Sequence, residues 1–292
     1  MRNRIRNTSN KFYTAIILLL FFLFTSEYIA QTPNQIVVYK TIDSIKLKLF
    51  VFTPLNNNSA VKKPAIVFFH GGGWNNGSPK SFFRQSEYLA SRGIVAISAQ
   101  YRLRDSNGTT PKECVKDSKS AIRWVRAHAL EFGIDSDRIA AGGGSAGGHI
   151  AAAAATLKFF DEDFEDKSIS SKPNALVLFN PVIDNGPDGY GYERVKEYWQ
   201  EFSPLHNLSL QSPPTLFMLG TADHLIPVST GEKYKNEMEK LGIRCDLILY
   251  ENEKHGFYNK SKYFETLLET DKFLKSMGYL EGEPTLKPDN VK

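Results

Sequence analysis

Residues 139–150 of this 292-residue chain read Ile-Ala-Ala-Gly-Gly-Gly-Ser-Ala-Gly-Gly-His-Ile. A short apolar run leads into glycines, and an alanine-rich stretch of helical character follows Ser145. A serine with a glycine two places away on each side, where a strand passes into a helix, predicts a strained turn that exposes the hydroxyl. Ser145 is therefore a candidate nucleophile. The alternative, a phosphate-binding loop, requires a lysine followed by serine or threonine, and the segment has neither.

Apolar runs typical of strands alternate with segments typical of helices on both sides of this turn. The predicted strands are 36–39, 45–52, 65–69, 94–99, 139–141, 175–179, 215–219 and 246–250, and the predicted helices are 82–92, 113–132, 146–159, 230–241 and 263–277. This alternation predicts an α/β fold with a mostly parallel central sheet of about eight strands and helices on both faces. In such sheets the functional residues gather at the carboxyl ends of the strands.

A second glycine turn, residues 70–74, directly follows the predicted strand 65–69 and reads His-Gly-Gly-Gly-Trp. Glycines let backbone N–H groups turn toward a developing oxyanion, and the residue after the nucleophile supplies another N–H group. The expected donors are Gly71, Gly72 and Gly73, without a choice of two among them, together with Ala146. Trp74, at the end of the turn, is the expected substrate contact.

An acid and a histidine complete the set in the order that such a serine requires. Asp223 follows the predicted strand 215–219, and His255 follows the predicted strand 246–250. The acid would orient the imidazole, which would take the serine proton and later return one. The other candidates are Asp184 for the acid and His70, His128, His149, His206 and His224 for the base. Among these, we expect His70 to hold the glycine turn and His149 to pack in the core.

Positive charge is concentrated at the N-terminus. The chain holds 36 basic and 32 acidic residues, and residues 1–30 contain four of the basic residues and one acid. The remainder is nearly neutral and lacks a Lys/Arg-rich run, which argues against a nucleic-acid partner. A basic stretch, an apolar run over 15–24 and polar residues up to Ala30 are typical of an export signal. About ten apolar residues fall short of the ~20 of a spanning helix, so we expect cleavage after Ala30, no stable membrane span afterwards and a periplasmic or secreted protein. An uncleaved anchor is the alternative.

The expected organisation is a signal peptide over 1–30, one domain over 31–280 and a polar tail over 281–292. Two segments interrupt the alternation of strands and helices. Residues 161–172 are acidic but lack the glycine turn and closing glutamate of an EF-hand loop, so we expect a solvated loop and no metal site. Residues 185–212 contain glycines, prolines and aromatic residues, and are equally compatible with a lid or pocket wall and with surface packing.

Two cysteines, Cys114 and Cys245, are too few for a disulfide scaffold. Two buried thiols are the simpler expectation. Pairing in an oxidising compartment remains open, because the sequence does not show whether the sulfurs meet.

These motifs together resemble the α/β-hydrolase superfamily, in particular its hormone-sensitive-lipase-like esterases and the related bacterial carbohydrate acyl-esterases, over about residues 35–277. The resemblance rests on residues 70–74, Tyr101-Arg102-Leu103, Asp137-Arg138-Ile139, 143–149, 220–223 and His255-Gly256-Phe257. It implies an α/β-hydrolase fold, structural roles for Tyr101 and Arg102, and no metal or organic cofactor. Such esterases usually carry a helical cap before the first core strands. Here only about five residues separate the expected cleavage site from a strand, which favours an open cleft.

The resemblance implies a serine esterase that hydrolyses short-chain carboxylic esters. Because an open cleft suits short acyl groups on bulky alcohols, acylated carbohydrate is the hypothesis for the substrate, and a small-molecule ester is the broader expectation. The residues do not indicate the acyl length, the natural alcohol or the oligomeric state. Two alternatives stand beside the esterase: a serine peptidase similar to the catalytic domain of prolyl oligopeptidase, and a non-catalytic binding protein on the same fold.

Overall fold

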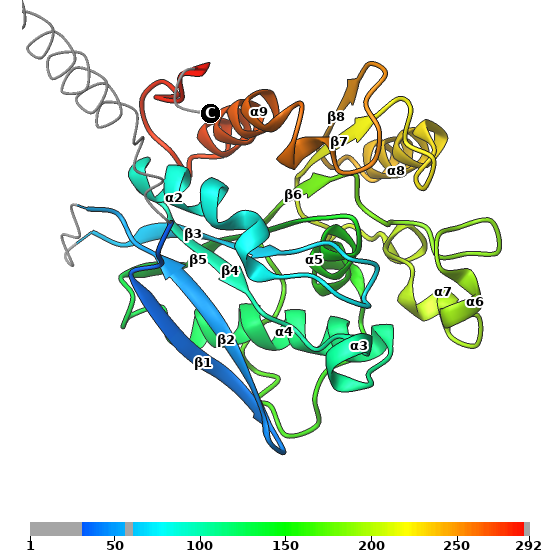
Figure 1. Cartoon of the computed structure of the whole chain (residues 1–292), viewed down its shortest axis with the longest axis horizontal. Coiled ribbons are helices and arrows are strands. Elements are labelled where there is room, and N and C mark those ends of the chain that lie inside the picture. Colours follow the sequence, from blue (N-terminus) through cyan, green and yellow to red (C-terminus); the bar gives the residue numbers. More distant parts are fainter. Residues whose placement is uncertain (1–30, 56–60, 289–292) are drawn as a thin grey trace, which may run out of the picture. The chain divides into compact units, whose positions relative to one another are not determined.

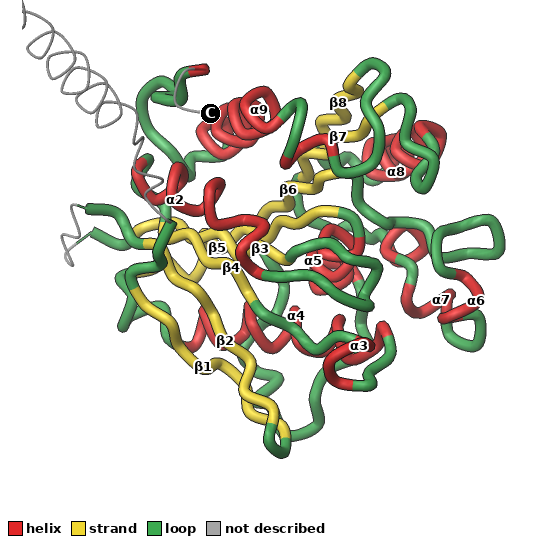
Figure 2. The backbone as a smooth tube through the Cα atoms, in the orientation of Figure 1, coloured by secondary structure: helices red, strands yellow, loops and turns green. Residues whose placement is uncertain are grey.

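An eight-stranded sheet runs through the centre of the fold, as Figures 1 and 2 show. The computed structural model describes residues 31–55 and 61–288, and the described residues from Pro33 onward form one compact unit. The strand order is β1-β2-β4-β3-β5-β6-β7-β8. The strands are β1 Gln35–Ile42, β2 Ile45–Phe52, β3 Lys63–Phe69, β4 Val95–Ala99, β5 Ile134–Gly144, β6 Ala175–Phe179, β7 Thr215–Gly220 and β8 Cys245–Tyr250.

Most neighbouring strands are parallel. β1 pairs with β2, and β2 with β4, in antiparallel fashion, and every other neighbouring pair is parallel. A parallel sheet covered on both faces needs strands that are apolar on both sides. In β3, Val67 and Phe69 face one core cluster while Ile66 and Phe68 face the other. The prediction of an α/β fold with a mostly parallel sheet is therefore confirmed.

Helices cover both faces of the sheet. On the face of Val67 lie α4 Pro111–Ala127, α5 Ala146–Thr156 and α8 Val228–Lys240, and on the face of Phe68 lie η1 Pro79–Phe82, α2 Phe83–Ser91 and α9 Tyr263–Ser276 (Figure 1). The remaining short helices are α3 Arg104–Asn107, α6 Tyr192–Val195, α7 Trp199–Phe202, η2 Pro204–Asn207 and η3 Phe257–Asn259.

The ends of α4 differ from the prediction of a helix over 113–132. The helix begins at Pro111 because Thr110 and Glu113 form a capping box, in which the Glu113 carboxylate accepts from the Thr110 backbone N–H at 2.8 Å. It ends at Ala127, and a series of turns leads to β5. Phe132 still packs against the ring of Trp124, so an apolar residue beyond the helix end continues the helical pattern in the sequence.

The predicted signal peptide lies outside the described residues, as does the end of the predicted polar tail. In the part of the chain that the structure describes, no helix is long and apolar enough to cross a membrane. Cys114 and Cys245 are both buried and unpaired, so the expectation of two buried thiols is confirmed.

The prediction that residues 161–172 form a solvated loop is wrong for the acidic side chains at its start. Glu162 is only 7% exposed. Its carboxylate accepts from Lys40 Nζ and Arg102 Nη2, both at 2.8 Å. Asp161 accepts from Arg123 at 2.7 Å and also pairs with Lys119. These acidic side chains form ion pairs with lysine and arginine side chains of β1, α4 and the segment after β4. The ion pairs hold this loop against the rest of the domain.

Candidate active site

Ser145 occupies the turn between β5, which ends at Gly144, and α5, which begins at Ala146. Its backbone has φ 55° and ψ −121°, a conformation that costs energy for any residue with a side chain. A Cβ atom on Gly147 would lie 2.0 Å from the carbonyl oxygen of Phe69 at the end of β3. Only glycine allows α5 to approach β3 this closely. The turn therefore brings Ser145 to the carboxyl edge of the sheet, beside the glycine loop.

Ser145, His255 and Asp223 form one hydrogen-bonded row. The Ser145 Oγ lies 2.8 Å from Nε2 of His255, and Nδ1 of His255 lies 2.7 Å from Oδ2 of Asp223. Asp223 follows β7 and His255 follows β8, so parallel strands deliver all three residues to the same edge. The structure thus brings together the three residues that were predicted as nucleophile, base and acid.

The Asp223 carboxylate is held from its other side as well. Its Oδ1 accepts from the backbone N–H groups of Leu225 at 2.8 Å and Ile226 at 3.1 Å. The carboxylate itself is fully buried, whereas the imidazole of His255 is 23% exposed. Because three N–H groups point at this carboxylate, it is oriented to keep a proton on Nδ1 of His255 and to leave Nε2 free to accept one.

Asn180, which the sequence analysis did not identify, also contacts His255. It follows β6 and is fully buried. Its Oδ1 accepts from the Gly256 backbone N–H at 3.1 Å, and its Nδ2 lies 3.3 Å from Nε2 of His255. Asn180 therefore fixes the loop that carries the histidine. Its position at the carboxyl end of a parallel strand was the only signal that could have identified it.

The glycine loop lies against the serine. A Cβ atom on Gly71 would lie 3.3 Å from the Cβ of Ser145, and Gly72 and Gly73 have φ values of 124° and 61°, which favour glycine. The N–H groups of these three glycines and of Ala146 donate no hydrogen bond to any residue that the structure describes. They are thus available to a ligand beside Ser145.

Hydrogen bonds fix the peptide planes that carry these N–H groups. The carbonyl of His70 accepts from the Tyr101 hydroxyl at 2.7 Å, and the carbonyl of Gly71 accepts from Nδ1 of His70 at 2.7 Å. The carbonyl of Gly72 accepts from the Asn75 N–H at 3.0 Å. Each carbonyl shares its peptide group with the N–H of the next residue in the loop, so each potential donor is oriented before a ligand arrives.

Ala146 is oriented in the same way, because the carbonyl of Ser145 accepts from the backbone N–H groups of His149 at 3.0 Å and Val182 at 3.1 Å. Burial lowers the pKa of His70 to about 4, so this histidine is neutral and donates from Nδ1. The expected roles of His70 in holding the loop and of Tyr101 as a structural residue agree with these contacts.

The side chain of Trp74 is placed differently from the prediction. It is only 1% exposed and packs edge-on against His149, with ring centroids 5.1 Å apart, and against Tyr190 and Phe202. This placement does not support the expected substrate contact, because the indole is enclosed by these rings. His149 belongs to the same core, where burial lowers its pKa to about 3 and Nε2 donates to the Phe202 carbonyl.

The other candidates lie outside the row. Oδ1 of Asp184 accepts from the Gly186 N–H at 2.8 Å and lies 3.8 Å from Nδ1 of His206. His206 contacts the Ser203 hydroxyl, His224 is exposed, and His128 caps α4 with its Nδ1 near the Trp124 carbonyl. None of these side chains makes a hydrogen bond to Ser145 or His255 among the described residues.

The segment 185–212 forms part of the wall beside the glycine loop. Nη1 of Arg194, in α6, donates to the Gly73 carbonyl at 2.7 Å, and its guanidinium lies 4.7 Å from the centre of the Trp74 ring. The segment therefore braces the loop that carries the candidate oxyanion donors. Of the two interpretations that the sequence left open, the contacts favour a pocket wall for this part.

Comparisons with known proteins identify relatives over most of the chain. A family model described as BD-FAE matches residues 51–187, and the model of the dienelactone hydrolase family matches residues 192–275. Apo esterase 2 of Thermogutta terrifontis is 40% identical, with a TM-score of 0.82 over 85% of this chain and 96% of that one. Structures of that esterase include a propionate-bound form and a form phosphonylated by cyclosarin.

Curated relatives are more distant. The chain is 28% identical over 260 residues to a probable isoprenylcysteine alpha-carbonyl methylesterase, ICMEL1, of Arabidopsis thaliana, covering 80% of this chain and 52% of that protein. It is 26% identical to the acylamino-acid-releasing enzyme of Arabidopsis thaliana, covering 75% of this chain and 31% of that protein. The chain thus spans about half, or less, of the length of these curated relatives.

Proposed function

Since the chain belongs to the α/β-hydrolase superfamily, among its hormone-sensitive-lipase-like esterases, we propose that it is a serine esterase that hydrolyses short-chain carboxylic esters. The observation that carries the proposal is the row of hydrogen bonds from Ser145 through His255 to Asp223, 2.8 Å and 2.7 Å long. Such a row activates a serine hydroxyl because the imidazole accepts its proton as the hydroxyl attacks.

The reaction begins when Oγ of Ser145 attacks the ester carbonyl carbon and its proton passes to Nε2 of His255. The carbonyl oxygen becomes an oxyanion facing the N–H groups of the glycine loop and of Ala146. As the tetrahedral intermediate collapses, the bond to the alcohol oxygen breaks, and His255 gives that oxygen the proton. Water then attacks the acyl-serine with the same proton transfers, which releases the carboxylic acid and restores Ser145. Asp223 remains ionised and stabilises the imidazolium.

Short acyl groups are supported by the propionate-bound and butyrate-bound structures of the Thermogutta terrifontis esterase. For this chain, kcat/KM on p-nitrophenyl esters should be highest for acetate to butyrate and fall toward octanoate. An increase from acetate to octanoate would contradict the proposed acyl length while leaving ester hydrolysis intact.

Acylated carbohydrate is the proposed natural substrate. The match of residues 51–187 to the BD-FAE family model and the resemblance of the sequence motifs to bacterial carbohydrate acyl-esterases support it. Export of the protein, with removal of residues 1–30, is a further part of the proposal, and it would place the enzyme where extracellular glycans occur. N-terminal sequencing of protein recovered outside the cytoplasm should begin at Gln31, and recovery only from the cytoplasm with Met1 intact would contradict export.

A fluorophosphonate probe separates an active esterase from a binding protein on the same fold. The probe phosphonylates a serine only when the neighbouring base is functional, so the native protein should be labelled and Ser145→Ala should not. The match to acylamino-acid-releasing enzymes keeps a peptidase as the second candidate. Cleavage of an N-acetylated amino-acid p-nitroanilide at a kcat/KM above that for p-nitrophenyl acetate would reverse the order of the two.

A further inference from the structure

A hollow of about 260 Å³ lies between the segment that follows β6 and the segment that follows Asp223. The segment after β6 forms one side, with Asp184, Asp188 and Tyr190. The other side is formed by the segment between β7 and α8, with Leu225, and by the first turns of α8, with Lys233.

Each wall touches a residue of the site, one through hydrogen bonds to Asp223 and the other by lying against Gly73. The backbone N–H groups of Leu225 and Ile226 donate to the Asp223 carboxylate at 2.8 Å and 3.1 Å. On the opposite wall, the Tyr190 hydroxyl lies 3.1 Å from where a Cβ on Gly73 would sit. Residues that line the hollow therefore contact both the acid of the row and the glycine loop. An ester whose carbonyl reaches Ser145 can extend from there toward the hollow.

The lining offers both donors and acceptors of hydrogen bonds. Asp188 is exposed and makes no hydrogen bond to any residue described in the structure. Lys233, 54% exposed, has its Nζ 4.0 Å from the Asp184 carboxylate, which offsets part of that charge. Leu225, 45% exposed, and the ring of Tyr190 add apolar surface. A sugar matches this combination because each hydroxyl donates and accepts, while the C–H face of the ring packs on apolar side chains.

Other leaving groups fit less well. A long alkyl alcohol would cover the exposed carboxylate of Asp188 without offering it a hydrogen bond, which is costly. A cationic alcohol would meet the carboxylates but also the like charge of Lys233. We propose that this hollow, the 184–233 pocket, binds the sugar of an acylated carbohydrate and so selects the alcohol side of the substrate. This inference rests on the proposed esterase function.

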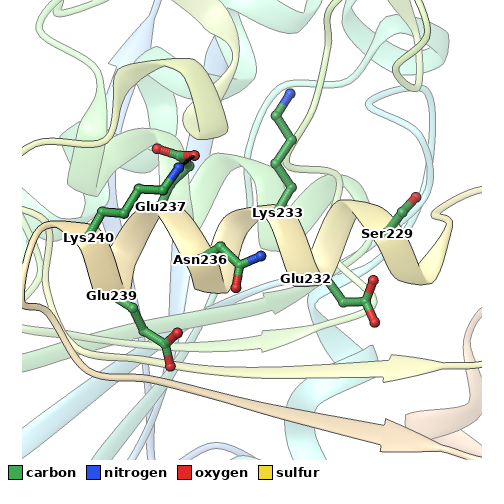
Figure 3. A pocket seen from close by; sticks show the side chains of 7 residues that line it. All are labelled: Ser229, Glu232, Lys233, Asn236, Glu237, Glu239 and Lys240. Atoms are coloured by element: carbon green, nitrogen blue, oxygen red, sulfur yellow. Dashed lines mark hydrogen bonds and ion pairs between the residues drawn. The ribbon is translucent and has the colours of Figure 1, made fainter.

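A second hollow, of about 630 Å³, runs along α8 and differs in kind (Figure 3). All the residues that line it come from that one helix, and Figure 3 shows Lys233 and Glu232 pointing to opposite sides. Lys240 and Glu237 point toward each other and pair at 2.7 Å. The charges there are spread around a helix surface or already paired, so this surface provides no comparable site.

The first experiment compares two acetate esters that differ only in their alcohol. We measure kcat/KM for acetylated methyl β-xylopyranoside and for methyl acetate, and take their ratio. In Asp188→Ala this ratio should fall about tenfold, because the sugar loses one hydrogen bond to a charged acceptor. The matched control is Asp163→Ala, whose side chain is fully solvated in a remote loop, and its ratio should equal that of the wild type. An Asp188→Ala ratio within twofold of the wild type overturns the inference.

The second experiment measures binding without turnover. Ser145→Ala protein is mixed with the acetylated xyloside, and saturation-transfer difference NMR records which sugar protons lie near the protein. The signals of the ring protons should be strong and should weaken when Asp188→Ala is added. Ring signals that are unchanged by Asp188→Ala overturn the inference while the esterase proposal stands. If the wild type hydrolyses no ester, the esterase proposal is wrong. The NMR binding data then still decide whether the 184–233 pocket binds the sugar.

Discussion

Asp117 lies at the centre of a buried ion cluster, and replacing it by asparagine should destabilise the protein strongly. Its carboxylate is fully buried and accepts from Lys40 Nζ at 2.6 Å. It also accepts from the backbone N–H, Nε and Nη2 of Arg102, each at 2.8 Å. The neutral amide would leave the two cations with the carboxylate of Glu162 as their remaining buried counter-charge.

The expected loss follows from the desolvation of the two cations. Breaking a buried ion pair by removing one partner costs about 3–5 kcal/mol, because the other charge stays buried without compensation. An exposed pair contributes about 0–1 kcal/mol. Asp117→Asn should therefore lower the free energy of unfolding by about 3–5 kcal/mol. At roughly 2 °C per kcal/mol for a domain of this size, the melting temperature should fall by about 6–10 °C.

Circular dichroism during thermal and urea unfolding measures both quantities. Asp163→Asn serves as the matched control, because its carboxylate is fully exposed and lies 3.9 Å from Lys167, and its melting temperature should stay within about 1 °C of the wild type. If Asp117→Asn lost less than about 1 kcal/mol, the cluster would contribute no more than a surface pair, and the reasoning about burial would be refuted.

Three further results are expected. Gly147→Ala should lose most of its kcat in ester hydrolysis and about 1–3 kcal/mol of stability in urea unfolding, because the new Cβ would lie 2.0 Å from the Phe69 carbonyl oxygen. A wild-type kcat would contradict the close packing at this turn. Burial acts to raise the pKa of Glu162, but its bond to Lys40 and the nearby cations hold that pKa below the usual value. The stabilisation of the protein by this carboxylate should therefore be fully present above about pH 4.3 and fall as the pH drops through the lower pKa of the folded state; unfolding curves that did not change down to pH 3 would refute this. Asn180→Ala should lower kcat more than it changes KM, because the loop of the catalytic histidine loses its bond at 3.1 Å, and an unchanged kcat would count against that role.

Two short strands could be predicted to the residue. The predicted bounds 45–52 and 175–179 are those of β2 and β6. β2 alternates apolar residues with Lys46 and Lys48, β6 is an uninterrupted apolar run, and both are bounded by polar residues, so little else competes with a strand. The order of serine, acid and histidine was also readable, since parallel strands deliver their carboxyl ends to one edge and the motif fixes which residues follow each strand.

The contacts made by single side chains could not be predicted in the same way. The acidic run at 161 is indistinguishable from a solvated loop until Lys40, Arg102 and Arg123 are placed around it. Trp74 stands beside the site in sequence, but the rings that enclose it come from α5 and the segment 185–212. Each of these outcomes depends on partners distant in the chain, which local patterns do not specify.

The central claim is that Ser145 forms the acyl-enzyme. Protein quenched in acid during turnover of p-nitrophenyl acetate, digested and analysed by mass spectrometry shows where the acetyl group is attached. The account predicts acetylation on the peptide that contains Ser145, and its absence in both Ser145→Ala and His255→Ala. Acetyl transfer to a different residue during turnover, or full hydrolysis by Ser145→Ala, would contradict it.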